Sequence, residues 1–209
     1  MINNNLKEYL DTNILIQYKD YDRAHNIDHI LSVIKASFEL IKDYNLNEDM
    51  VYTIAIFHDL GLPQGRDTHH LTSAILLEND SYIKNYFNNE QIEIMKHAIE
   101  DHRASNPNKP RNIYGEIISS ADRIIDVDTI IYRTLVYGLD HNNDISVKDN
   151  IKRTHEHIIN KYGENGYLKL PILTQSNKEN LELLREISKD YNKFISICND
   201  ILNLSKKYD

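Results

Sequence analysis

The sequence contains one cysteine, no tryptophan, six glycines and four prolines among its 209 residues. A single cysteine, Cys198, excludes an intramolecular disulfide. Scarce glycine and proline leave long stretches without turn residues, which favours helices joined by short loops. The N-terminal segment lacks a basic start followed by a long apolar run, so we expect neither a signal peptide nor a membrane-spanning helix. We therefore expect a cytoplasmic protein.

An excess of positive charge is also missing. The formal net charge is -8, and the Lys and Arg residues are scattered along the chain. Binding to nucleic acid or to an anionic membrane needs clustered Lys and Arg, because these residues neutralise phosphates. We therefore expect neither membrane binding nor stable nucleic-acid binding, and the acidic balance favours a small substrate.

Apolar residues recur at steps of three and four in most of the chain, and this spacing predicts an all-α helical bundle. One apolar run, residues 50–57, follows Asn47, which is predicted to cap a helix. Ser176 and Glu179 form a predicted capping box. The chain is interpreted as a single domain over residues 1–209, with a core at about 20–140 and a C-terminal helical extension at about 145–209. Helices are predicted at about 27–41, 48–57, 68–77, 89–101, 114–124, 127–137, 147–161 and 177–204.

The pair His58-Asp59 ends the apolar run 51–57. Neighbouring side chains on a regular helix point about 100° apart, so both could bind one ion only near a helix end. The Gly61-Leu62-Pro63 break predicts such an end. His29 and Asp122 also lie in apolar helical surroundings, where a polar side chain costs free energy unless it is paired or coordinated. These residues form a candidate metal site.

Three segments that carry these residues resemble the HD superfamily of metal-dependent phosphohydrolases, in the same order and in a helical setting. They are 29–33, 55–61 and 120–123, and the likeness covers about residues 20–140. Segments 69–73, 100–105 and 110–115 are similar to a bacterial subgroup without an assigned substrate. The resemblance implies an HD-domain helical bundle with additional C-terminal helices. It also implies that His29, His58, Asp59 and Asp122 ligate a divalent ion.

The activity implied by this resemblance is hydrolysis of a nucleotide or another small phosphate ester by metal-activated water. Several HD proteins hold a second metal with extra histidines, and His69 and His102 resemble those positions. Asp101, beside His102, is a candidate for the same second site or for a general acid or base. The sequence does not choose among Mn, Mg, Fe, Ni, Co and Zn, or between one ion and two per chain.

Three further residues are candidates for substrate binding, namely Arg103, Arg66 and His70. The guanidinium of Arg donates two parallel hydrogen bonds to a phosphate, which makes it well suited to this role. Two alternative functions stay open at this point, an HD-type di-iron oxygenase and a non-enzymatic helical module that binds a nucleotide. A homodimer is compatible with the sequence, which does not fix the oligomeric state.

Overall fold

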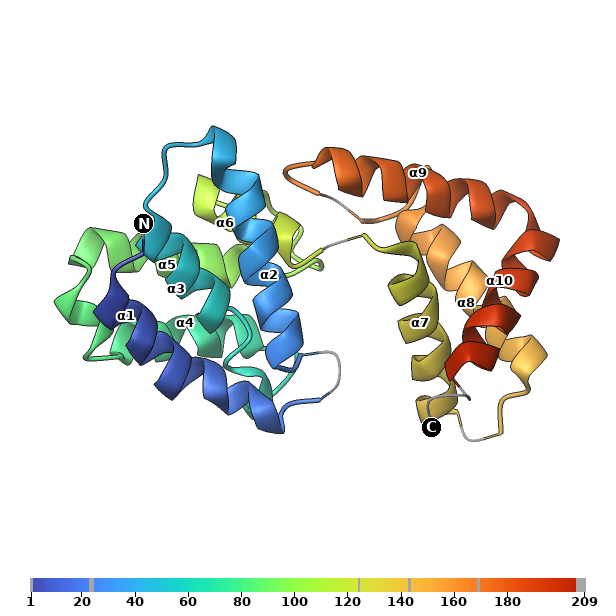
Figure 1. Cartoon of the computed structure of the whole chain (residues 1–209), viewed down its shortest axis with the longest axis horizontal. Helices are drawn as coiled ribbons and strands as arrows, with labels where there is room; N and C mark the ends of the chain where they lie inside the picture. The colour runs from blue at the N-terminus through green and yellow to red at the C-terminus, as the bar shows by residue number, and fades with distance from the viewer. Residues whose placement is uncertain (1, 23–24, 124, 143, 169, 206–209) are drawn as a thin grey trace. The chain divides into compact units, whose positions relative to one another are not determined.

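The computed structural model describes residues 2–22, 25–123, 125–142, 144–168 and 170–205. Within these ranges it contains ten α-helices and no β-strand, so the all-α prediction is confirmed. The helices form two compact units, which are described separately (Figure 1). Unit 1 comprises Met1–Ile124 with Leu170–Ile172, and unit 2 comprises Ile125–Lys169 with Leu173–Asp209.

Unit 1 begins with α1, which continues as a π-helical and then a 3-10 segment over Leu10–Ile14 and Leu15–Asp20. No helix was predicted here from the sequence, although Leu6, Leu10 and Ile14 recur at helical spacing and are buried. The remaining helices pack around the same core. The α-helices of unit 1 are α1 (Asn4–Tyr9), α2 (Ile27–Leu40), α3 (Glu48–Phe57), α4 (His69–Asn79), α5 (Asn89–Asp101) and α6 (Ile113–Ala121).

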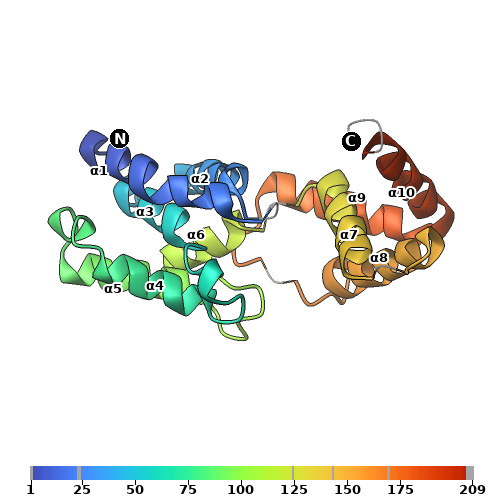
Figure 2. The same ribbon diagram turned by 90° about the horizontal axis from the view of Figure 1, so that it is seen from below.

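Helix α3 lies at the centre of unit 1. Every residue from Met50 to Phe57 is buried, and α3 packs against α2, α4, α5 and α6. The predicted cap is confirmed, because the Asn47 side chain accepts hydrogen bonds from the amides of Asp49 and Met50. Figure 2 shows α4 and α5 side by side along one edge of the unit. The C-terminal end of α3, and with it His58-Asp59, is therefore enclosed by other helices.

Unit 2 consists of four helices around a second apolar core, which includes Val127, Ile131 and Leu135 from its first helix. The helices are α7 (Val127–His141), α8 (Val147–Tyr162), α9 (Gln175–Lys189) and α10 (Tyr191–Ser205). No helix in the described part of the chain is long and apolar enough to cross a membrane.

Helix α7 packs on α8, α9 and α10 and belongs to unit 2, and the predicted core at about 20–140 with its extension at about 145–209 stays a prediction. Two other predictions differ from the structure. The helix predicted over 177–204 is two helices, because Asp190 is extended (φ -106°, ψ 97°) and its carboxylate caps α10. Thr174, not Ser176, caps α9, since its hydroxyl accepts from the amide of Asn177. The interpretation of residues 1–209 as one domain stays a prediction.

Candidate metal centre

The predicted metal ligands lie at helix ends. His29 is in the first turn of α2, and His69 is the first residue of α4. His58, His102 and Asp122 directly follow α3, α5 and α6. His58, His102 and Asp122 keep right-handed helical backbone angles as C-caps, so each helix sets the direction of its own terminal side chain. Five helix ends can thus direct their side chains toward one region.

Four of these residues form what we call the first ligand group, which comprises His29, His58, Asp59 and Asp122. One ligand atom from each lies within 4.8 Å of all the others. The Oδ1 atom of Asp122 is 3.2 Å from Nε2 of His29 and 3.8 Å from Nε2 of His58. The Oδ2 atom of Asp59 is 3.8 Å and 3.4 Å from the same two nitrogens. Two nitrogens and two oxygens around one point are a suitable donor set for a first-row divalent ion.

The second ligand group comprises Asp59, His69 and His102, and all three are buried. It uses the other oxygen of the same carboxylate, because Oδ1 of Asp59 is 3.2 Å from Nε2 of His69 and 3.5 Å from Nε2 of His102. The two Nε2 atoms are 3.4 Å apart. The structure therefore brings the two extra histidines to the same Asp59 that completes the first group.

Backbone carbonyls orient three of these imidazoles in the same way. The Nδ1 atoms of His58, His69 and His102 lie 2.8, 2.7 and 2.6 Å from the carbonyl oxygens of Ala55, Arg66 and Ile99, each three residues earlier. A proton on Nδ1 makes this bond and leaves the lone pair of Nε2 directed toward the group.

Two Nε2 atoms of the first group are left without a hydrogen-bond partner. The buried Nε2 atoms of His29 and His58 have none with suitable geometry among the described residues. A buried polar atom without a partner is costly, and a metal ion would satisfy both atoms at once.

The electrostatics of the first group also favour a cation. Burial alone would lower the pKa of His58, but the carboxylates of Asp59 and Asp122 outweigh it and raise that pKa well above its ordinary value. Burial would likewise raise the pKa of Asp59, but His58, His102 and His69 hold it well below its usual range. The buried Asp59 and partly buried Asp122 carboxylates thus require positive charge between them, which a divalent ion supplies without a proton on the imidazole.

The second group depends on a close approach between Gly61 and α4. The amide of Gly61 donates to the Ser73 hydroxyl at 2.8 Å. A Cβ atom on Gly61 would lie 2.5 Å from the carbonyl oxygen of His69 and 2.7 Å from the Ser73 amide. Only glycine leaves room for α4 here, and this contact positions His69 beside Asp59.

Side-chain hydrogen bonds from other segments fix the backbone around the metal centre. The hydroxyls of Tyr18 and Tyr21 donate to the carbonyls of Ile56 and Leu60, on either side of His58-Asp59, at 2.7 Å each. On the other side of the centre, the carbonyl of His102 accepts from Ser119 at 3.0 Å and from Arg123 at 2.7 Å. These contacts join segments far apart in sequence, so no local spacing predicts them.

Asp101, a predicted catalytic or second-metal residue, belongs to neither ligand group. Its carboxylate accepts from the backbone amide, Nε and Nη2 of Arg111, each at 2.9 Å. Arg111 also pairs with Glu100. The bidentate geometry gives Asp101 a structural partner across the loop between α5 and α6.

The three predicted substrate contacts differ in their surroundings. Arg103 directly follows His102 and donates to the carbonyl of Asp67, whose own carboxylate is 3.9 Å away and fully exposed.

His70 lies against the His69 ring, with 5.6 Å between ring centroids, and its buried Nδ1 has no partner among the described residues. Burial, and then the charge of Arg103, lowers the pKa of His70 to about 4. The Arg66 side chain is exposed, and its carbonyl orients His69.

Residues 26–126 match the HD domain family. The chain therefore carries an HD domain. The matched range extends from the N-cap of α2 to the residue before α7, so it contains both ligand groups and all five helices that supply them.

One relative of this chain is an uncharacterized protein of Clostridium beijerinckii (strain ATCC 51743 / NCIMB 8052). It is 29% identical over 104 residues, and the alignment covers 48% of this chain and 64% of that protein. No solved structure matches the chain.

Proposed function

We propose that this HD-domain protein is a metal-dependent phosphohydrolase that acts on a nucleotide or another small phosphate ester. The observation that carries the proposal is the carboxylate of Asp59, which directs Oδ2 to the first ligand group and Oδ1 to the second. A carboxylate that faces two sets of imidazole nitrogens supports a two-metal site with Asp59 as the bridge.

When bound, a divalent pair supplies positive charge for phosphoryl oxygens and lowers the pKa of a water molecule near them. The chain's own contribution is orientation. The Nδ1 bonds of His58, His69 and His102 fix three imidazoles, and burial of Asp59 excludes bulk water from the centre. In a site with little water, fixed charges act more strongly on a substrate anion.

Arg103 and His70 supply the candidate phosphate contacts at the rim of the second group. Arg103 is held by a backbone carbonyl, and its nearest carboxylate, that of Asp67, lies in solvent. Its charge is therefore only weakly neutralised, as an anion-binding residue requires. The net charge of -8 over the whole chain supports a small anion as substrate and not a long nucleic acid.

The test begins with the purified protein loaded in turn with Mn, Mg, Fe, Ni, Co and Zn. Phosphomonoesters, phosphodiesters and nucleoside polyphosphates are then assayed with each form. We expect turnover of at least one small phosphate ester, and a KM about tenfold higher in Arg103→Gln with unchanged metal content. Arg133→Gln, an exposed change of the same type on α7, is the control.

Two results would contradict the hydrolase proposal. Binding of metal and nucleotide without turnover of any ester would favour the nucleotide-binding module. Two irons with redox activity would favour the oxygenase, which the second ligand group also supports because it completes a six-residue set of histidine and aspartate side chains. Metal identity and redox activity separate these two enzymes.

A further inference from the structure

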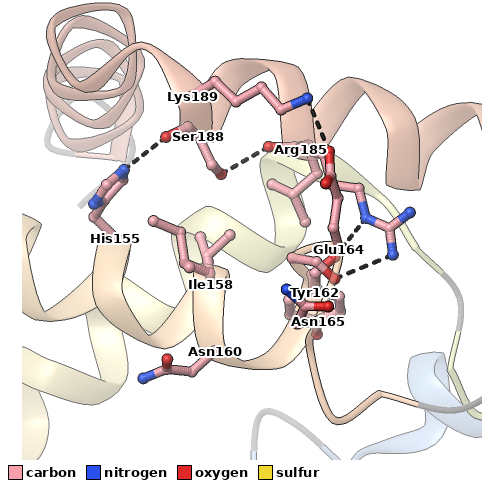
Figure 3. Close-up of a pocket in the computed structure, with 12 residues that line it drawn as sticks. His155, Ile158, Asn160, Tyr162, Glu164, Asn165, Arg185, Ser188 and Lys189 are labelled. Carbon is pink, nitrogen blue, oxygen red and sulfur yellow. Dashed lines mark hydrogen bonds and ion pairs between the residues drawn. The ribbon is translucent and has the colours of Figure 1, made fainter.

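Unit 2 contains a cavity of about 570 Å³, which lies within the range of about 300–1,000 Å³ typical of small-molecule sites. It is lined by α8, the turn at residues 163–165 and α9, and it uses no residue of the HD domain. Figure 3 shows Ile158 between His155 on one side and Arg185 with Glu164 on the other. We call it the α8–α9 cavity.

The floor of this cavity is apolar. Ile158 and Leu184 line it and are almost completely buried, with 1% and 0% of their surface exposed. Tyr162 also lines it, and burial raises the pKa of its hydroxyl to about 12, so the ring stays neutral. An apolar floor of this kind can bury the hydrocarbon part of a ligand.

The rim of the cavity carries an excess of positive charge. Arg185 uses Nε and Nη2 to bind the carbonyls of Tyr162 and Gly163 at 2.8 and 3.2 Å, where α8 ends. These bonds hold the guanidinium in one orientation, yet both acceptors are neutral. Arg185 forms no ion pair with any carboxylate in the described part of the chain. Its charge is therefore fixed in place, and the nearby Glu164, whose pKa it helps to lower, forms its ion pair with Lys189 instead.

The second cation at the rim is Lys189, whose Nζ lies 3.0 Å from Oε1 of Glu164. Both side chains of this pair are largely exposed, at 67% and 69%. An exposed pair of this type contributes little free energy, so an anion can displace the Glu164 carboxylate from Lys189. Two cations and one acid leave the rim with a net positive charge in a chain whose total is -8.

We propose that the α8–α9 cavity binds a small organic anion, with its charged group at Arg185 and Lys189 and its apolar body on Ile158 and Leu184. The inference goes beyond the proposed hydrolase, and neither depends on the other. A guanidinium fixed by two backbone carbonyls retains donors for a carboxylate or a phosphate, and the apolar floor selects anions that carry a hydrocarbon part.

The probes are benzoate and benzamide, which have nearly the same shape and differ in charge. The full-length protein is titrated with each, and binding is followed by the ¹H–¹⁵N shifts of the amides of residues 163–165 and of Arg185 Nε–H. Saturable shifts are expected with benzoate, with a Kd of about 1 mM, and at least tenfold weaker binding with benzamide. Equal binding of the two probes, or no saturable shift with benzoate, would overturn the proposal.

Three exposed substitutions sharpen the test without touching the core. Glu164→Gln should bind benzoate about threefold more tightly, because it frees Lys189. Lys189→Gln should bind it about threefold more weakly, and Lys178→Gln, a matched exposed change on α9, should bind it as the wild type does. A purely structural role of the Lys189–Glu164 pair predicts no gain in Glu164→Gln, so an unchanged or weaker affinity there would contradict the assignment.

Discussion

Asp59 and His69 are ten residues apart in sequence, yet Oδ1 of Asp59 lies 3.2 Å from Nε2 of His69. The other oxygen of this carboxylate faces His58, at 3.4 Å from Nε2. Asp59 is therefore shared by two sets of nitrogen atoms, and its substitution should affect both sets, whereas substitution of His69 should affect one.

His69→Gln is predicted to lose one of two bound ions, because it removes an Nε2 atom from the second ligand group and leaves the first group complete. Metal per chain, measured by inductively coupled plasma mass spectrometry, gives the answer. His97→Gln makes the same change at a more exposed site, where the imidazole pairs with Glu93 at 3.0 Å, and should keep both ions. A His69→Gln variant with full metal content would remove this residue from the site.

Gly61→Ala is predicted to lower the free energy of unfolding by about 1–3 kcal/mol and to weaken binding of the second ion. Its Cβ would lie 2.5 Å from the carbonyl oxygen of His69, so the start of α4 must move away from Asp59. Urea unfolding and metal content are measured together. Gly115→Ala is the control, because its Cβ would lie 2.9 Å from Pro110 and perturb packing without moving α4. Equal metal loss in both variants would show a general effect of destabilisation.

Arg111→Gln is predicted to cost about 2 kcal/mol of unfolding free energy, because the buried Asp101 carboxylate loses its bidentate partner. Metal content per folded chain should not change, and neither should kcat in the folded fraction. Asp101→Asn should behave in the same way. Loss of kcat in Asp101→Asn at normal stability and metal content would support the catalytic role that the sequence predicts for Asp101.

The stability of unit 2 should depend on pH through His157. Burial, and then the charges of Lys161 and Arg153, lower the pKa of His157 in the folded chain. In the unfolded chain the pKa of this imidazole is about 6.5, so the unfolded chain takes up the proton first as the pH falls. The free energy of unfolding should therefore decrease as the pH falls below about 6.5. Urea unfolding at pH 7 and pH 5.5 should show that the free energy of unfolding decreases less between these two pH values in His157→Gln than in the wild type. His141→Gln is the exposed control. The same decrease in the free energy of unfolding in all three proteins would refute the prediction.

Much of the fold and of the site was predictable from local sequence signals. The apolar run before His58-Asp59 and the Asn47 cap predicted α3 and its end, and the family resemblance implied the ligands that the structure brings together. Helical spacing over residues 27–41 placed His29 on α2. These signals are local, because caps and periodicity depend on neighbours within a few residues.

The remaining features depend on contacts between distant segments. The pairing of Asp101 with Arg111 spans a loop, and the support of the His58-Asp59 backbone by Tyr18 comes from a different helical segment. The break at Asp190 needs a side chain that caps the next helix, and an aspartate inside an apparently continuous helix does not reveal this. The assignment of α7 to unit 2 depends on which helices its apolar face meets, which periodicity leaves open.

The bridging position of Asp59 between the two ligand groups can be tested by the metal content of the wild type and of Asp59→Ala, measured after equilibration with excess ion and removal of free metal. Two ions per chain are predicted in the wild type. Asp59→Ala, which removes both carboxylate oxygens, should retain neither ion and should lose phosphoesterase activity. Full metal content in Asp59→Ala, or a wild type that never exceeds one ion per chain, would show that Asp59 does not bridge two ions.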